Sequence, residues 1–276
     1  MIFTYKAWDK FCGALSDSGI KSISANQVTE NNRGYLVLKH DVETDVSRAY
    51  DIAMIEHRYG HRGTYYVQAY LMDDAKNIEF LKRMQNMGHE ISYHYDVMDS
   101  NKGDIERAIT EFGKNLNVFE KNGISIQTVC QHGNPVIERV GYTSNRDFFR
   151  NKKVQELYPH ISDIMVDYKR KHKTDYSYFS DAGRKFKLIY DPLYNDIIPS
   201  DDKNIVYDDL TALYKAINMD NGNIISIHPH RWTRSPVIYI LKSSVFKVIK
   251  SCAKLLIKIP IFKKIMSRYY YLAKKI

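Results

Sequence analysis

The feature that most constrains the fold is an alternation of strand-like and helix-like segments through the first half of the chain. Runs rich in β-branched and aromatic residues fall at 35–43, 64–70, 89–94 and 124–130. Segments with apolar residues at about every third or fourth position lie between them. Strands joined by helical crossovers run parallel in one sheet. The pattern therefore predicts an α/β protein, arranged as a doubly wound sheet or as a β/α barrel.

The remainder of the chain continues this pattern less regularly. The predicted helices are 45–59, 77–87, 104–121 and 210–219, and the later strands are 161–167, 176–180 and 223–227. Residues 1–25 form a peripheral helical segment, and residues 136–160 have no firm period and indicate an insertion at the rim of a pocket. We expect one domain over 1–235 and a helical tail over 236–276.

Charge is distributed unevenly along the sequence. The formal net charge is +9, but no Asp or Glu follows Asp220, whereas twelve Lys or Arg do. Residues 1–220 therefore carry 29 basic and 32 acidic groups, a net charge of −3. A nucleic-acid-binding domain carries basic groups across a folded face. We expect no nucleic-acid partner, and neither a deaminase nor a nuclease acting on one.

Cysteine usage and the N-terminal residues bear on the compartment. Cys12, Cys130 and Cys252 lie far apart with no CxxC spacing, which argues against a disulfide framework and against a thiolate zinc site. The first residues lack a basic segment followed by an apolar one, so we expect no export signal. The expectation is a cytoplasmic protein.

The tail over 236–276 has the pattern of a basic amphipathic helix. Apolar residues recur at three- or four-residue spacing between 238 and 259, and lysines occupy another face. The helix is expected to break at Pro260 and to resume as far as Leu272. Lysines interrupt the apolar runs too often for a membrane span. Two placements stay open: the helix lies on an anionic membrane, the inner face for a cytoplasmic protein, or it packs on the domain.

Ionisable residues collect at the predicted carboxyl ends of the strands. Asp41 and Glu43 end the first strand, and His94, His132 and His228 end or follow three others. Parallel α/β folds bring such ends together, so we expect these side chains to converge. A carboxylate with two imidazoles is a usual ligand set for a catalytic divalent metal, zinc first, with iron, cobalt, nickel or manganese as alternatives. A second carboxylate as base and another histidine as acid would suit amide or ester hydrolysis.

Three stretches resemble, in the right order, the motifs of the polysaccharide deacetylase superfamily, carbohydrate esterase family 4. They are Leu38–Glu43 (LKHDVE), Gly88–His94 (GHEISYH) and Ile225–His228 (ISIH). This resemblance implies a distorted β/α barrel that removes acyl groups, mostly N-acetyl, from amino sugars with a divalent metal. It implies Asp41 and His94 as metal ligands, Glu43 as the base and His228 as the acid. His40 stands beside Asp41 in the place of the family's paired aspartates and is counted with the catalytic residues.

The sequence departs from the family at the third metal ligand. The second family motif places another histidine four residues after its first, where this chain has Met98. A thioether is a poor ligand for a hard or borderline metal. His132, in the stretch HGNP, is our first choice for the missing ligand, and Asp96 or Asp99 is the alternative.

The stretches HDVE, HGNP, SDAGR and HPHRW also resemble a divergent branch of deacetylase-like proteins associated with surface-polysaccharide synthesis. This resemblance implies a substrate pocket lined by Asp96, Asn134, Asp181, Arg184, His230 and Trp232. A helix N-cap is the alternative for Asp181, and packing or a surface ion pair is the alternative for Arg184 and Trp232.

Together these patterns predict a metal-dependent hydrolase that removes an acyl group from an amino sugar. Its substrate would be a lipid-linked or nucleotide-linked intermediate of surface-glycan assembly. The missing second histidine supports an alternative, a catalytically degenerate barrel that binds a glycan or a protein partner at the membrane. The basic tail supports another, a peripheral membrane scaffold.

Overall fold

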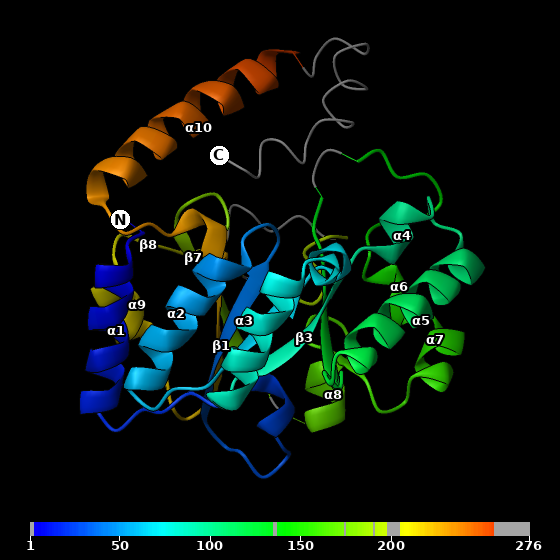
Figure 1. Cartoon of the computed structure of the whole chain (residues 1–276), viewed down its shortest axis with the longest axis horizontal. Helices are drawn as coiled ribbons and strands as arrows, with labels where there is room; N and C mark the ends of the chain where they lie inside the picture. Colours follow the sequence, from blue (N-terminus) through cyan, green and yellow to red (C-terminus); the bar gives the residue numbers. More distant parts are fainter. Residues whose placement is uncertain (1–2, 135–136, 174, 190, 198–204, 257–276) are drawn as a thin grey trace.

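The computed structural model describes residues 3–134, 137–173, 175–189, 191–197 and 205–256. Its centre is one nine-stranded sheet with the order β5-β4-β3-β2-β1-β9-β6-β7-β8 (Figure 1). The strands are β1 (Tyr35–Val42), β2 (Gly63–Val67), β3 (Glu90–Tyr95), β4 (Thr128–Gln131), β5 (Ser162–Asp163), β6 (Tyr176–Ser180), β7 (Phe186–Leu188), β8 (Ile205–Tyr207) and β9 (Gly222–Ile227). Neighbours from β5 through β6 pair in parallel, whereas β7 and β8 pair antiparallel at one edge.

The predicted α/β class is confirmed, whereas the predicted barrel is not. Within the described part of the chain, β5 and β8 stand at the two ends of the strand order and do not pair with each other. A barrel closes only when its first and last strands share a ladder. Since β5 has two residues and β8 has three, neither end offers a long ladder, and the sheet is open.

Helices cover the sheet, and α1, α2 and α3 lie side by side across one face (Figure 1). The helices of the domain are α1 (Tyr5–Asp17), α2 (Val46–Arg58), α3 (Ala75–Asn86), α4 (Val97–Ser100), α5 (Ile105–Lys121), α6 (Asp147–Arg150), α7 (Lys152–Leu157), α8 (Tyr168–His172) and α9 (Leu210–Ala216). A side-chain oxygen accepts from a first-turn backbone N–H at the start of α1, α2, α3, α5 and α9, which satisfies an N–H that has no partner inside the helix.

Strand β1 is buried along its whole length, and its side chains alternate between two faces. Leu36 and Leu38 pack in the apolar cluster that contains residues of α1 and α2. Tyr35 and Val37 pack in a different cluster, which contains Tyr66 of β2. This alternation determines the face on which each polar side chain at the end of β1 lies. Odd-numbered residues continue the face of Val37, and even-numbered residues continue the face of Leu38.

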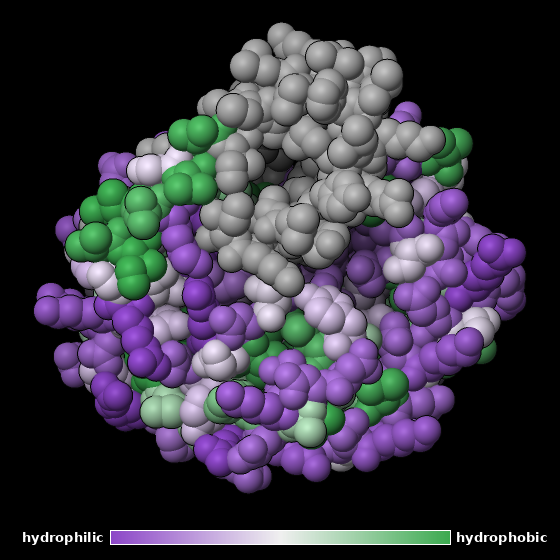
Figure 2. Space-filling model, turned by 45° about the horizontal axis from the view of Figure 1, so that its top comes forward, coloured by the Kyte–Doolittle hydropathy of each residue, from purple (hydrophilic) through white to green (hydrophobic). Residues whose placement is uncertain are grey.

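Helix α10 (Pro236–Leu256) follows the last strand and lies along the top of the molecule in Figure 1, the side toward which β1 runs. Its base is joined to the start of α1, since Tyr5 N donates to Thr233 O (3.0 Å) and Thr233 N donates to Phe3 O (3.1 Å). The predicted helix over 238–259 thus begins at Pro236, while the break at Pro260 and the continuation to Leu272 lie outside the described residues. No helix in the described ranges is both long enough and apolar enough to cross a membrane. Figure 2 shows apolar residues of α10 at the surface.

Candidate active site

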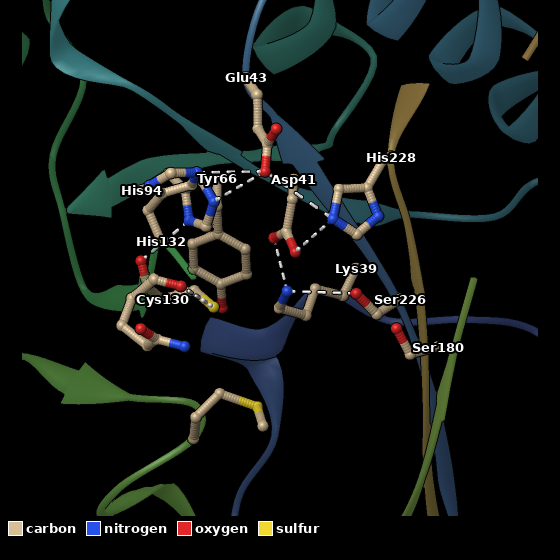
Figure 3. A network of polar contacts seen from close by, with 12 residues as sticks. Lys39, Asp41, Glu43, Tyr66, His94, Cys130, His132, Ser180, Ser226 and His228 are labelled. Carbon is tan, nitrogen blue, oxygen red and sulfur yellow. Dashed lines mark hydrogen bonds and ion pairs between the residues drawn. The ribbon is translucent and has the colours of Figure 1, made fainter. Parts of the chain in front are cut away.

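The five predicted residues Asp41, Glu43, His94, His132 and His228 meet at the carboxyl edge of the sheet (Figure 3). They end or follow β1, β3, β4 and β9, and these strands lie close together in the order β4-β3-β2-β1-β9. All of them except His228 are buried, and the imidazole of His228 is 13% exposed. The convergence expected from the topology is therefore present.

Glu43 is the central carboxylate of this cluster. Its Oε1 lies 3.5 Å from His132 Nε2, 4.0 Å from His94 Nε2 and 3.8 Å from His228 Nε2. Figure 3 shows its carboxylate between the two imidazoles of β3 and β4 on one side and the imidazole of His228 on the other. One oxygen thus faces three imidazole nitrogens at distances too long for direct hydrogen bonds.

The surroundings of His94 prepare its Nε2 to act as a ligand. Nδ1 lies 3.0 Å from the backbone oxygen of Cys130, so Nδ1 carries the hydrogen and donates it to that carbonyl. Nε2 is buried, has no hydrogen-bond partner among the described residues and is directed toward Glu43. Burial lowers the pKa of His94 to about 3, which keeps the ring neutral. A neutral imidazole whose other nitrogen is held by a carbonyl is the usual form of a metal-bound histidine.

The residues present fit a divalent metal. One oxygen of Glu43 and one nitrogen each of His94 and His132 lie within 4.8 Å of one another. Two imidazoles and a carboxylate are a ligand set that zinc uses in catalytic sites, with a further position left for water or substrate. A second group of donor atoms, from Asp41, His94 and Cys130, shares His94 with the first. The buried thiol of Cys130 was not expected in this place.

Asp41 is held by a lysine that the sequence analysis overlooked. Lys39 Nζ lies 2.5 Å from Asp41 Oδ1 and donates to Ser226 Oγ at 3.2 Å, and this ammonium is 1% exposed. Burial alone would raise the pKa of Asp41, but Lys39, His94 and His228 together hold it well below its usual range. The pairing raises the pKa of Lys39 despite the burial of its ammonium. Both groups are therefore charged at neutral pH.

The carboxylate that groups with both His94 and His132 differs from the one that the resemblance implies. The resemblance implies Asp41 as ligand and Glu43 as base, yet Glu43 is the carboxylate that groups with both His94 and His132. The extra methylene of Glu43 carries its carboxylate to the imidazoles, while the shorter Asp41 is turned toward Lys39. Asp41 Oδ2 then lies 3.8 Å from His228 Nε2.

His228 is oriented by Asp181, which lies on the neighbouring strand end after β6. His228 Nδ1 lies 2.5 Å from Asp181 Oδ1, and His228 N donates to Asp181 Oδ2 at 3.0 Å. Arg231 Nη1 also donates to Asp181 Oδ1, at 2.9 Å. These contacts direct Nε2 of His228 toward both carboxylates of β1. Asp181 is fully buried behind His228, so it positions this histidine instead of capping a helix or lining the predicted pocket.

His40 does not belong to this site, which corrects its predicted catalytic role. It is an even-numbered residue of β1, so its ring lies on the opposite face of the sheet from Asp41. Its Nε2 is 2.9 Å from Glu56 Oε1, which also accepts from Trp8 Nε1 at 3.1 Å, while Glu56 Oε2 accepts from Tyr65 Oη at 2.7 Å. His40 therefore belongs to a buried cluster that joins α1, α2 and β2.

Two of the predicted pocket residues have structural roles instead. Trp232 is fully buried, with its ring stacked on Phe3 and in edge contact with Trp8. Arg184 has a left-handed backbone (φ 62°) and points toward α10, where its guanidinium lies 4.7 Å from the ring centroid of Phe246. Both residues follow strand ends that carry site residues, but the turn directs each side chain away from the carboxylates.

His230 stays beside the site, with its ring 5.8 Å from that of His228 in an edge contact. Burial, together with Arg231, lowers the pKa of His230 to about 3. Its imidazole therefore lines the site in the neutral form. Asn134 lies in the loop after His132, where its backbone oxygen accepts from Arg139 Nη2 at 3.0 Å.

The alternative ligands Asp96 and Asp99 lie elsewhere. Asp99 receives two hydrogen bonds from Arg139, both at 2.8 Å, and so anchors the loop that follows β4. Asp96 lines a cavity of about 300 Å³. Its lining includes polar and acidic residues, Gln68, Tyr70, Asp73, Asp96, Glu111 and Asn115, together with Ala69 and Val118. Tyr70 connects this cavity to the site, because its hydroxyl donates to the backbone oxygen of Glu43.

The fold and the site together define a class: an open, mostly parallel α/β protein with a carboxylate–imidazole cluster suited to a divalent metal, beside an aspartate-held histidine. No protein-family model matches the sequence, and no curated protein matches it. Similar solved structures include a CE4 esterase of Streptococcus mutans, with 13% identity, a TM-score of 0.46 and coverage of 83% of this chain and 89% of that one.

Two further solved structures are also similar to this chain. The Bc1960 peptidoglycan N-acetylglucosamine deacetylase is 14% identical, with a TM-score of 0.39 and coverage of 81% and 83%. BA3943, a CE4 family pseudoenzyme from Bacillus anthracis, is 12% identical, with a TM-score of 0.36 and coverage of 80% and 62%. At these values neither activity nor its loss carries over, and the chemistry must be argued from the residues of this site.

Proposed function

We propose that the protein is a divalent-metal-dependent hydrolase that removes an acyl group, N-acetyl in the first instance, from an amino sugar. The observation that carries the proposal is the grouping of one possible ligand atom each from Glu43, His94 and His132 within 4.8 Å of one another, with Glu43 Oε1 3.8 Å from His228 Nε2. The order of the motifs along the sequence supports the same reaction class. We further propose a substrate from surface-glycan assembly, carried on a nucleotide or a lipid.

In this proposal Glu43, His94 and His132 hold the metal. When bound there, the metal would lower the pKa of water and polarise the amide carbonyl. Asp41 is the carboxylate left to accept the proton of the attacking water. Lys39 keeps Asp41 ionised and fixed in position, and the same pairing makes it a weaker proton acceptor.

His228 supplies a proton to the departing amine. Its Nδ1–H is committed to Asp181, so Nε2 is the nitrogen that faces the reacting groups. The buried carboxylate of Asp181 stabilises the imidazolium and fixes the ring, which is the role of the aspartate in hydrolase triads. The acidic cavity beside Tyr70 offers carboxylates and amides to the hydroxyl groups of a sugar.

A second function is favoured by one observation. The ammonium of Lys39 already neutralises Asp41, which suits a site that binds a glycan without hydrolysing it. The two functions differ in turnover. A deacetylase releases free amine from N-acetylated amino-sugar oligomers, whereas a binding protein retains them unchanged.

Metal binding tests the site directly, through zinc stoichiometry and affinity measured by calorimetry on purified protein. Replacing His94 or His132 by Ala should lower zinc affinity by more than about 100-fold, because even indirect partners of a ligand contribute 10–100-fold. The control is His160→Ala, since His160 is exposed and lies outside the cluster. Equal zinc binding in wild type, His94→Ala and His160→Ala would refute the metal site.

Free-amine release then separates hydrolase from binding protein. Turnover that needs added metal and is lost in His228→Ala supports the hydrolase. Binding of the oligomer without any release of amine, in protein loaded with zinc, would contradict the hydrolase and leave the binding protein.

A further inference from the structure

Helix α10 has an inner face that packs on the domain. Tyr239 is 6% exposed, and its ring lies 5.7 Å from that of Phe3. Ser243 Oγ accepts from Arg184 Nη1 at 3.4 Å, and the ring of Phe246 receives the guanidinium of the same arginine. These residues stand at i, i+4 and i+7, so they lie along one side of the helix.

The opposite side of α10 is apolar and uncovered. Its exposed aliphatic residues, with exposed fractions, are Val237 (73%), Leu241 (66%), Val248 (63%), Ile240 (55%), Ile238 (48%) and Val245 (41%). They appear as the green patch at the upper left of Figure 2. Single exposed aliphatic residues are common on soluble proteins, but a contiguous row of this size marks a surface that contacts a partner or a membrane.

The net charge of residues 237–276 favours an anionic lipid surface over a second copy of the helix. Residues 237–276 contain ten Lys or Arg and no Asp or Glu. A second copy of the helix would bring its own lysines against them, and like charges at an interface oppose association. An anionic lipid surface provides both an apolar layer for the aliphatic row and a negative potential for the basic groups.

We propose that α10 docks the protein on an anionic lipid surface through its outer aliphatic face. The arrangement in Figure 1 places α10 on the same side of the molecule as the carboxyl end of β1. Arg184 contacts α10 and follows Asp181, the partner of His228, by three residues. Docking would therefore place the candidate active site next to the lipid. A lipid-linked amino sugar would then be the substrate, an assignment that rests on the proposed function.

The test measures binding of the full chain to vesicles by co-flotation. Vesicles of phosphatidylcholine are compared with vesicles that also contain phosphatidylglycerol. The test variant is Leu241→Glu with Val248→Glu, both on the outer face. The matched control is Val140→Glu with Ile205→Glu, at positions 82% and 56% exposed, because it makes the same change in net charge outside α10. All four positions are exposed, so both variants should fold, and their melting temperatures are to be compared with that of wild type.

The expected result is binding of wild type to the phosphatidylglycerol vesicles, at least about ten-fold weaker binding of the α10 variant, and binding of the control within about two-fold of wild type. Equal loss in both variants would overturn the proposal, since charge alone would then explain binding. Equal binding to neutral vesicles, or no binding, would also overturn it. A wild-type dimer that the α10 variant converts to a monomer, without vesicle binding, would assign the face to a second copy.

Docking on the lipid surface and catalysis are tested by independent assays. Amine release from a soluble substrate by the wild-type protein reports on catalysis alone, and vesicle binding reports on docking alone. Vesicle binding without amine release would support docking by α10 and would contradict the proposed hydrolase activity.

Discussion

Replacing Lys39 by Met tests how the site is stabilised. The variant removes the ammonium that lies 2.5 Å from Asp41 and leaves that carboxylate buried without its main counter-charge. Breaking a buried ion pair at one partner costs about 3–5 kcal/mol. For a chain of this size, about 2 °C of melting temperature corresponds to 1 kcal/mol. We therefore expect Lys39→Met to melt about 6–10 °C below wild type at neutral pH.

The pH dependence of this loss follows from the shifted pKa of Asp41. In wild type that pKa is below its unfolded value of about 3.9, so the stabilisation is fully present above about pH 3.9 and is lost as pH falls through the folded pKa. Without Lys39, burial is the largest influence and raises the folded pKa above the unfolded value. The difference in melting temperature between variant and wild type should then shrink as pH is lowered from about 8 toward 5.

Two controls make the result interpretable. Arg83→Met removes one partner of an exposed pair with Glu79, whose side chains are 54% and 62% exposed, and should leave the melting temperature nearly unchanged. Lys39→Met combined with Asp41→Asn removes both charges and should regain at least half of the lost stability. If Lys39→Met is as stable as Arg83→Met, or if the double variant is no more stable than the single one, the reasoning is refuted.

Further predictions concern Asp181 and Glu56. Asp181→Asn should lower kcat/KM for deacetylation by about 100-fold or more, because His228 loses the partner that fixes its tautomer; an unchanged pH–rate profile would contradict this role. Glu56→Gln should cost about 2–4 kcal/mol in urea unfolding at neutral pH, since a buried carboxylate that accepts from Trp8 and Tyr65 is replaced by an amide. His40 and the other partners hold the pKa of Glu56 below its usual value against burial, so this stabilisation is present above about pH 4.3 and lost as pH falls; a pH-independent difference would contradict the assignment.

The parallel α/β core could be predicted because its signals are local. The apolar run from Tyr35 to Val42 and the three-to-four spacing of Ile105–Lys121 each fix one element within a short window. Whether the sheet closes depends instead on pairing between β5 and β8, which lie far apart in the sequence and contain too few residues for a readable period. The barrel that the resemblance implies is therefore not confirmed.

The candidate site was predicted in part for the same reason. Asp41, His94, His132 and His228 lie at or just after the ends of four strands, and side chains alternate between the two faces of each strand. Their convergence can therefore be predicted from the topology alone. The same period places His40 on the other face, so its inclusion was avoidable. The sequence analysis assigns no role to Lys39. Its position two before Asp41 on one face was the available signal.

Other outcomes depend on turns that sequence does not specify. Asp181 reaches His228 only because β6 lies beside β9, a neighbour relation between segments that have α9 between them in the sequence. Trp232 enters the core because the turn after β9 directs it toward Phe3 and Trp8. Neither direction can be read from the stretch of sequence alone.

Arg184 links α10 directly to Asp181, the residue that orients His228. Its guanidinium rests on α10, and its backbone N donates to the carbonyl oxygen of Asp181 at 3.0 Å. A shift of α10 would act through Arg184 on Asp181, the carboxylate that orients His228. A contact on the outer face of α10 would in this way change the orientation of His228 without any ligand at the candidate active site.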